Sequence, residues 1–450
     1  MTLLKRPSFV LIIALYLMAA NSAFAKGLIR DAEIESDLRA ISAPLFEAAG
    51  LNPAQVKIVL INDDNVNAFV AGGQNLFIYT GMILEAKTVG ELSGVIAHEA
   101  GHMAGGHLIR MRGAAERASL ESMAATVLGI AVGVGAGDAN AGVATVMGGG
   151  EYANRVMLRN SRVFESSADQ AGMAAIERAG YSTRGMASFL ERLAGQEVLP
   201  ELQRSGYVLT HPLSHERLET VESFVTRSRN KDKKWPDELE NKFRMVQAKL
   251  LAFTNPARAM RQYESQNNTD AYYATAIAAY RQGRIDEALQ KLAVLEKGDA
   301  KNPWFKELRG QIYLEQGRIP QAVAAYRQAV ALSPQSGLIH LALAQALLQN
   351  ETQKPDEALR ELNAARDNGE EDTPGVYRWM AISYGRQGRE DLAKLSLAEE
   401  ALLKGDYNFA ITQAKSAEAL LAKDPAARQR ARDIQSAAMR SMSERKNSKG

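Results

Sequence analysis

The sequence predicts an α+β domain, mostly helical with a small sheet, followed by an all-α domain built from repeats. The β-type runs are confined to residues 56–80, where β-branched and aromatic residues lie between turn signals. Helical periodicity dominates elsewhere. In the second half, matching residues recur about every 34 positions, which is typical of helical repeats. A chain of 450 residues is long enough for two such cores.

The first 25 residues are typical of a secretory signal peptide. Lys5 and Arg6 precede an apolar run over residues 9–20, and Ala23-Phe24-Ala25 supplies a small-x-small cleavage site. The run is too short to span a bilayer comfortably, which disfavours an uncleaved anchor. We therefore expect cleavage before Lys26 and export to the periplasm, with an extracellular destination as the alternative.

Composition excludes several classes of protein. Removing the leader leaves equal numbers of basic and acidic residues, so neither nucleic acid nor an anionic membrane is indicated as a partner. The chain has no cysteine, which excludes disulfides and a lipid-modified N-terminal cysteine. No segment of the mature chain is a convincing transmembrane anchor. These features fit a soluble exported protein.

The first domain is expected over residues 26–230, with its sheet near the start. A strand is predicted at 56–61. Two more extended runs, 68–71 and 76–80, flank Gly72-Gly73, and a diglycine between apolar strands favours a hairpin. The predicted helices of this domain span 28–49, 91–111, 162–179, 182–194 and 214–227.

The second domain is predicted to be a tetratricopeptide-repeat solenoid over residues 266–440. Gly283 and Ala288 recur 34 residues later as Gly317 and Ala322. In such repeats, small residues let paired helices approach, aromatic rings fill the gap and proline ends the second helix. The clearest unit shows this spacing at Gly310, Tyr313, Ala322, Tyr326, Ala329 and Pro334.

The repeat array is expected to have irregular ends. Ala358 and Ala393 continue the series, whereas Ala410 follows at half the period, as in a capping element. Residues 231–265 are expected to form a linker and connecting helix, and residues 441–450 a disordered tail. A solenoid offers a concave face for a partner; the alternative is a rigid spacer that packs on the first domain.

One copy of H-E-x-x-H, from His98 to His102, lies in the predicted helix 91–111. Residues four apart on a helix share a face, so these two imidazoles can bind one ion. Glu99 lies beside them, where a carboxylate can take a proton from zinc-bound water. The motif therefore predicts a zinc hydrolase site of the zincin type.

A catalytic zinc site needs a third protein ligand. The metzincin position, six residues after His102, holds Leu108. His107 is one residue away, on a different face of the helix, and is expected to be structural or at the surface. Glu165 on a second predicted helix is the best candidate. Asp169, four residues later on the same face, is placed to accept a hydrogen bond from a ligating imidazole.

Two other segments keep alternative roles. His211 is expected to stabilise a tetrahedral oxyanion, to take the fourth zinc position and suppress activity, or to fix its own loop. The glycine-rich residues 123–150 are expected to form a mobile, partly helical hairpin near the site, or a poorly packed surface loop. His215 is expected to be structural or exposed, and no functional role is predicted for His340 in the repeats.

Three segments resemble the M48 family of zinc metallopeptidases: His98 to His102, Glu165-Ser166-Ser167-Ala168-Asp169, and His211-Pro212 to Arg217. The leader and the repeats resemble its periplasmic branch, and the match covers nearly the whole mature chain. The resemblance implies a zincin-like metalloprotease domain followed by the repeat solenoid. It implies one zinc ion per chain, bound by His98, His102 and Glu165, with Glu99 as general base. It also implies that Asp169 lies behind the ligands and that His211 and Arg217 lie near the active site.

For that branch, the resemblance implies a zinc endopeptidase with a chaperone-like role in assembly and quality control of outer-membrane β-barrels, which degrades misassembled ones. Expected partners are unfolded or stalled barrels and, through the repeats, the barrel-assembly machinery. An extended substrate is expected to pair with an exposed edge of the sheet at 69–80. The alternative is a non-proteolytic assembly adaptor with a structural or latent zinc site; Glu99 argues against it, because a structural site needs no such carboxylate.

Overall fold

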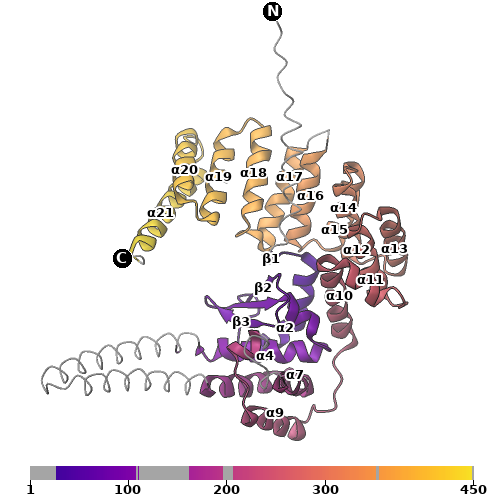
Figure 1. The fold of residues 1–450 in the computed structure, drawn as a ribbon. Coiled ribbons are helices and arrows are strands. Elements are labelled where there is room, and N and C mark those ends of the chain that lie inside the picture. The colour runs from indigo at the N-terminus through magenta and orange to yellow at the C-terminus, as the bar shows by residue number, and fades with distance from the viewer. Residues whose placement is uncertain (1–26, 108–109, 111–161, 196–205, 351–353, 448–450) are drawn as a thin grey trace, which may run out of the picture. The chain divides into compact units, whose positions relative to one another are not determined.

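The structure is a computed structural model that describes residues 27–107, 110, 162–195, 206–350 and 354–447. It divides into two compact units, one containing Ile34–Thr254 with the residues up to Arg30, the other containing Asp31–Glu33 with Asn255 onward. The first holds a small mixed sheet among helices and the second is helical (Figure 1). The predicted fold class is therefore confirmed. The predicted signal peptide and the segment 123–150 lie outside the described residues.

A four-stranded sheet lies in the first unit: β1 (Leu28–Ile29), β2 (Lys57–Ile61), β3 (Ala68–Ala71) and β4 (Asn75–Tyr79). The strand order is β1-β2-β4-β3, with β2 parallel to β4 and the other pairs antiparallel. The β3–β4 hairpin turns at Gly72 and Gly73, whose φ angles of 59° and 96° favour glycine. The predicted hairpin is confirmed, and β3 is an edge strand.

Helix α4 (Val89–Ala104) lies in the core of the first unit. Every residue from Val89 to His102 is buried, so α4 has no solvent-facing stripe over that length. Thr88 caps the helix by accepting a hydrogen bond from the amide of Glu91. The other helices of the unit are α2 (Ala32–Ala48), α3 (Thr80–Glu85), a helix over 162–178, α7 (Arg184–Ala194), α8 (Gly206–Thr210), α9 (His215–Arg227) and α10 (Asp237–Thr254).

Two predicted helix boundaries are wrong. The helix expected at 28–49 begins only at Ala32, because residues 28–29 pair with β2 as strand β1. The helix expected over 91–111 ends at Ala104. Gly105 and Gly106 follow it, and Gly106 has a left-handed φ of 60°, which turns the chain out of the helix.

Glycines let the helix over 162–178 approach α4 closely. A methyl group on Gly101 would lie 2.6 Å from the backbone oxygen of Ala168, and one on Gly172 would lie 3.0 Å from the backbone of Ala97. Packed backbone does not yield as a flexible side chain does, so these positions favour glycine. The two contacts fix the spacing between the helices that carry the predicted site.

The second unit is a succession of helices in which neighbours pack against each other. The turn glycines Gly283, Gly317 and Gly388 have φ angles of 78°, 70° and 72°, which suit left-handed turn positions. The helices are α11 (Pro256–Tyr263), α12 (Thr269–Arg281), α13 (Ile285–Gly298), α14 (Pro303–Glu315), α15 (Ile319–Leu332), α16 (Gly337–Gln349), α17 (Pro355–Ala365), α18 (Pro374–Arg386), α19 (Glu390–Lys404), α20 (Tyr407–Leu420) and α21 (Pro425–Asn447). Because α21 reaches Asn447, the segment expected to be a disordered tail from residue 441 is helical over most of its length.

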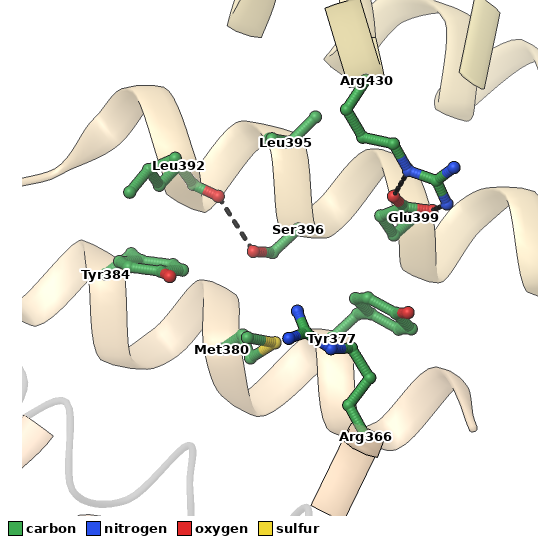
Figure 2. Close-up of a pocket in the computed structure, with 9 residues that line it drawn as sticks. All are labelled: Arg366, Tyr377, Met380, Tyr384, Leu392, Leu395, Ser396, Glu399 and Arg430. Atoms are coloured by element: carbon green, nitrogen blue, oxygen red, sulfur yellow. Dashed lines mark hydrogen bonds and ion pairs between the residues drawn. The ribbon is translucent and has the colours of Figure 1, made fainter. Parts of the chain in front are cut away.

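A cavity of about 370 Å³ lies in the second unit, between α18 and α19 (Figure 2). Its apolar lining comes from Met380 and Tyr384 on α18 and from Leu392 and Leu395 on α19. The charged lining residues are Arg366, Glu399 and Arg430. Among the described helices, none has the length and apolar character needed to cross a membrane.

Candidate metal centre

Helix α4 brings both motif histidines and the motif glutamate into the core. His98, Glu99 and His102 are at most 6% exposed. The Nε2 atoms of His98 and His102 lie 3.1 Å apart, as expected for side chains four residues apart on one helix face. The two imidazoles therefore offer nitrogen atoms to the same place.

Glu165 reaches that place from the helix over 162–178. Its Oε2 lies 3.3 Å from Nε2 of His98, and its Oε1 lies 3.3 Å from Nε2 of His102. His211 joins the group from the segment between α8 and α9, with Nδ1 3.2 Å from both oxygens of Glu165. The ring of Tyr207 stacks on His211, with centroids 4.6 Å apart, and so fixes its orientation.

These four buried groups fit a metal ion. One ligand atom from each of His98, His102, Glu165 and His211 lies within 4.8 Å of the others. The closest nitrogen and oxygen pairs are 3.1 to 3.3 Å apart. Ligands about 2.0–2.1 Å from a tetrahedral zinc ion lie roughly 3.3–3.4 Å from each other, and imidazole and carboxylate are common zinc ligands. The spacing and the chemistry of the donors both suit zinc.

Asp169 and Arg217 hold His98 from the side away from the cluster. Asp169 accepts a hydrogen bond from Nδ1 of His98 at 2.8 Å, which leaves Nε2 as the unprotonated nitrogen of the neutral ring. Arg217 donates to both oxygens of Asp169, at 2.6 and 2.9 Å. Its Nη1 also lies 3.1 Å from Oε2 of Glu165. One guanidinium therefore fixes the carboxylate behind His98 and contacts the carboxylate among the candidate ligands.

Burial and hydrogen bonding set the pKa values of these groups in opposite directions. Burial lowers the pKa of His98, but hydrogen bonds with Asp169 and Glu165 outweigh it and raise that pKa to about 10. Burial prevails at His102, whose pKa falls to about 4. Burial would raise the pKa of Glu165, yet hydrogen bonds with the neighbouring histidines hold it well below its usual range. A cation binds the neutral form of an imidazole, so metal binding and protonation compete at these histidines.

Glu99 lies beside the cluster without joining it. Neither of its carboxylate oxygens has a hydrogen bond of standard geometry to the described residues. The nearest ionisable contact is Nε2 of His211, 3.4 Å from Oε1. Burial raises the pKa of Glu99, and the charges of His211 and His98 oppose that rise. A buried carboxylate with a raised pKa is a stronger base than an exposed one, which suits a group that takes up a proton.

The structure brings together all the residues that the sequence assigned to the site: His98, Glu99, His102, Glu165, Asp169 and His211, with Arg217 beside them. His215 lies apart, with 85% of its side chain exposed, and pairs with Glu219. The sequence did not predict the contact between His107 and His102, whose Nδ1 atoms lie 3.2 Å apart. The sequence feature that could have indicated it is Gly105-Gly106, which ends α4 before His107.

Known protein families agree with both halves of this structure. Residues 29–225 match Peptidase family M48, residues 256–303 match a tetratricopeptide repeat, and residues 310–351 match a TPR repeat. Residues 29–225 are therefore a Peptidase M48 domain, and tetratricopeptide repeats follow it. Peptidases of this family are generally zinc-dependent, in line with the donor set.

Relatives of similar length share one name. The chain is 25% identical over 403 residues to the Beta-barrel assembly-enhancing protease of Escherichia coli strain K12. The matched region covers 87% of this chain and 80% of that protein. It is 24% identical over 365 residues to the protein of that name from Yersinia pestis, covering 78% and 72%. A putative beta-barrel assembly-enhancing protease of Vibrio cholerae is 29% identical over 177 residues, covering 39% of this chain and 34% of that one.

Proposed function

We propose that this chain is a zinc-dependent endopeptidase with one zinc ion per chain, bound by His98, His102 and Glu165. The observation that carries the proposal is the buried convergence of these three side chains with Glu99 alongside. When bound, zinc supplies a Lewis acid that polarises a peptide carbonyl and acidifies water near neutral pH. The M48 match over 29–225 supports the same chemistry.

Glu99 is the general base in this proposal. Its carboxylate has no side-chain hydrogen bond of standard geometry to the described residues, and the backbone of Val70 lies near enough to lower its pKa. The carboxylate can therefore take a proton from the attacking water and deliver it to the leaving nitrogen. Asp169 holds His98 with its proton on Nδ1, and Arg217 holds Asp169. These two residues position a ligand and do not touch the substrate.

The edge strand β3 is the element that supports binding of an extended substrate. It is unpaired by other described strands on one side, and it packs against α4, which carries Glu99. An unfolded segment can add to such an edge through backbone hydrogen bonds. A chain in a compact fold cannot, so we expect preference for unfolded or stalled proteins.

The decisive test is the substitution Glu99→Gln in the mature protein. We expect retention of zinc and loss of casein cleavage by about 100- to 10,000-fold, the usual contribution of a general base. A chelator is expected to abolish cleavage by the wild type. Glu191→Gln is the matched control, because Glu191 is exposed on α7 and should leave the rate unchanged. Normal cleavage by Glu99→Gln would exclude this mechanism.

We further propose that His211 takes the fourth metal position in the resting protein and keeps it latent. Its Nδ1 lies 3.3 Å from Nε2 of His98, among the candidate ligand atoms, and its other ring nitrogen faces Glu99. Water is required at that position for hydrolysis. His211→Ala should therefore raise basal proteolysis. A lower rate would favour the alternative role of His211 in stabilising the oxyanion.

We propose that the substrates are outer-membrane β-barrel proteins in the periplasm, which the chain helps to assemble or, when they are misassembled, degrades. The support is the shared name of the relatives. In a strain that lacks the gene, wild type and Glu99→Gln would be compared for folded barrels by gel mobility without heating. We expect stalled barrels to persist only with Glu99→Gln. Equal clearance of stalled barrels by both forms would contradict a degradative role.

We propose that the repeat unit binds the barrel-assembly machinery by receiving an apolar side chain in the cavity between α18 and α19. The apolar lining supports this. Arg430 is paired with Glu399 and Arg366 with Asp367, so the charges around the cavity are balanced and favour a neutral partner segment. Leu395→Glu should weaken co-purification with that machinery and leave casein cleavage unchanged. Val294→Glu on α13 is the control, since Val294 is already 56% exposed. Equal co-purification of both variants would exclude the cavity.

A non-proteolytic assembly adaptor is the second candidate function. The observation that favours it is the position of His211 among the candidate ligands, because a fourth protein ligand is typical of structural zinc sites. The adaptor predicts that neither wild type nor His211→Ala cleaves any unfolded barrel, while Glu99→Gln supports assembly fully. Chelator-sensitive cleavage by either of the first two proteins would exclude it.

A further inference from the structure

His107 lies directly behind His102, on the side away from the candidate metal position. We propose that His107 is a positioning residue of the metal centre, whose Nδ1 accepts a hydrogen bond from Nδ1 of His102 and so directs the Nε2 of His102 at the ion. The inference rests on the proposed function only in requiring that a metal ion binds there.

The contact between the two rings has the geometry of a hydrogen bond. Their Nδ1 atoms are 3.2 Å apart, and the ring planes are nearly perpendicular at 88°. A neutral imidazole carries its proton on one nitrogen only. If His102 binds a cation through Nε2, its proton must lie on Nδ1, so His102 is the donor and His107 the acceptor.

The chain reaches this arrangement through the Gly105-Gly106 turn. In a continuous helix, a residue five positions after His102 would be rotated by about 140° from it. Instead α4 ends at Ala104, and the left-handed φ of Gly106 redirects the chain. A methyl group on Gly105 would lie 2.3 Å from Nε2 of His107, so the close approach needs glycine. The turn therefore places His107 against His102.

Phe164 fixes the ring of His107 from its other face. The two rings stack with centroids 4.9 Å apart and planes 23° apart, and His107 is only 2% exposed. Phe164 directly precedes Glu165 on the helix over 162–178. His107 thus contacts both His102 and the helix that carries Glu165.

The two motif histidines are consequently held in different ways. His98 donates to the carboxylate of Asp169, which Arg217 holds with two hydrogen bonds. His102 has a ring nitrogen in the corresponding position. Loss of a group that orients a ligating histidine typically weakens metal binding by about 10- to 100-fold. His107 should therefore affect metal affinity although it contributes no ligand atom.

Two substitutions separate the hydrogen bond from the ring packing. His107→Phe keeps a ring against Phe164 and removes the acceptor, whereas His107→Asn keeps an acceptor oxygen near the position of Nδ1 and removes the ring. We expect His107→Phe to weaken zinc binding by about 10- to 100-fold and His107→Asn to change it only a few-fold. The measurements are zinc affinity by chelator competition and the visible spectrum of the cobalt-substituted protein.

The reverse order of the two variants, or equal affinities, would show that His107 acts through packing alone. Thermal unfolding of the metal-free variants tests whether each folds. A measurement on the wild type needs no variant: in the zinc-loaded protein, NMR should show an exchange-protected Nδ1 proton on His102, and its absence would overturn the proposal. Zinc affinity is measured whether or not casein is cleaved, so a protein that binds zinc without proteolysis would contradict the proposed activity and not this inference.

Discussion

The two units of this chain arrange their buried ionisable side chains in different ways. The first buries ionisable side chains, with His98, Glu99, Glu165, Asp169 and Arg217 each at most 5% exposed. The second is packed with small and aliphatic side chains, including Ala322 and Leu362, which are fully buried. Its buried carboxylates are paired with arginines instead of gathered in one cluster, as Glu399 is with Arg430 and Glu400 with Arg378. Buried charges cost free energy unless they are paired, whereas buried alanine and leucine need only close packing.

This difference indicates which unit depends on a bound ion for part of its stability. In the first unit, Glu165 and three imidazoles converge on one place, where a cation can compensate the carboxylate and accept the nitrogen lone pairs. In the second, the aromatic ring of Tyr326 fills the space that Gly310 leaves. We therefore expect metal to stabilise the first unit and not the second.

Removal of the metal should have the largest effect. An ion that binds only the folded protein stabilises it by about 4 kcal/mol at 1,000 times its Kd. In calorimetry of the full chain, chelation should lower the temperature of one transition and leave a second unchanged. In His98→Ala, which loses a ligand, neither transition should respond to the chelator. Equal shifts of both transitions in the wild type would contradict the expectation that the metal stabilises only the first unit.

The second-largest effect should come from adding a methyl group to a helix glycine in each unit. Gly101→Ala places a Cβ 2.6 Å from the backbone oxygen of Ala168, whereas Gly385→Ala in α18 meets no atom within 4 Å. Overpacking of a core typically costs about 1–3 kcal/mol. Alanine is favoured over glycine in an open helix position by up to about 1 kcal/mol.

We therefore expect Gly101→Ala to lower both the melting temperature of the first unit and its zinc affinity, because Ala168 lies between Glu165 and Asp169. Gly385→Ala should raise or preserve the melting temperature of the second unit. Calorimetry and chelator competition measure the two effects. Unchanged zinc affinity in Gly101→Ala would show that the spacing between α4 and the helix over 162–178 does not set the site.

The sequence predicted most of the fold because its signals are local. The β-branched run at 56–61, the diglycine at Gly72-Gly73 and the 34-residue spacing each involve neighbours along the chain or a regular period. Strand β1 was missed because its pairing with β2 joins residues far apart in sequence. The helical end of α21 was missed because chain ends are commonly disordered, whereas α21 continues to Asn447.

The candidate site was predictable only in part for a similar reason. His98 and His102 are related by helix geometry, which a sequence displays directly. Glu165 and His211 come from separate elements, and the contacts at Gly101 and Gly172 that bring one of those elements near are tertiary. The assumption of a continuous helix, which Gly105-Gly106 breaks, hid the contact of His107 with His102.

A pH-dependent effect in the second unit should be the smallest. His340 on α16 donates from Nδ1 to the carboxylate of Glu361 at 2.6 Å and from Nε2 to the carbonyl oxygen of Pro334 at 2.9 Å. Both partners only accept hydrogen bonds, so both ring nitrogens must carry protons. The hydrogen bond with Glu361 raises the pKa of His340 above its usual 6.5, against the opposing effect of burial.

Because the folded pKa of His340 is raised, its stabilisation is complete below pH 6.5 and is lost as the pH rises through the folded value. The melting temperature of the second unit should therefore fall over that range, by roughly 2–4 °C for each kcal/mol lost. His340→Gln should flatten the dependence, since glutamine does not titrate. His215→Gln should keep it, because His215 is exposed in the first unit. An unaltered slope in His340→Gln would exclude this pair as the cause of the pH dependence.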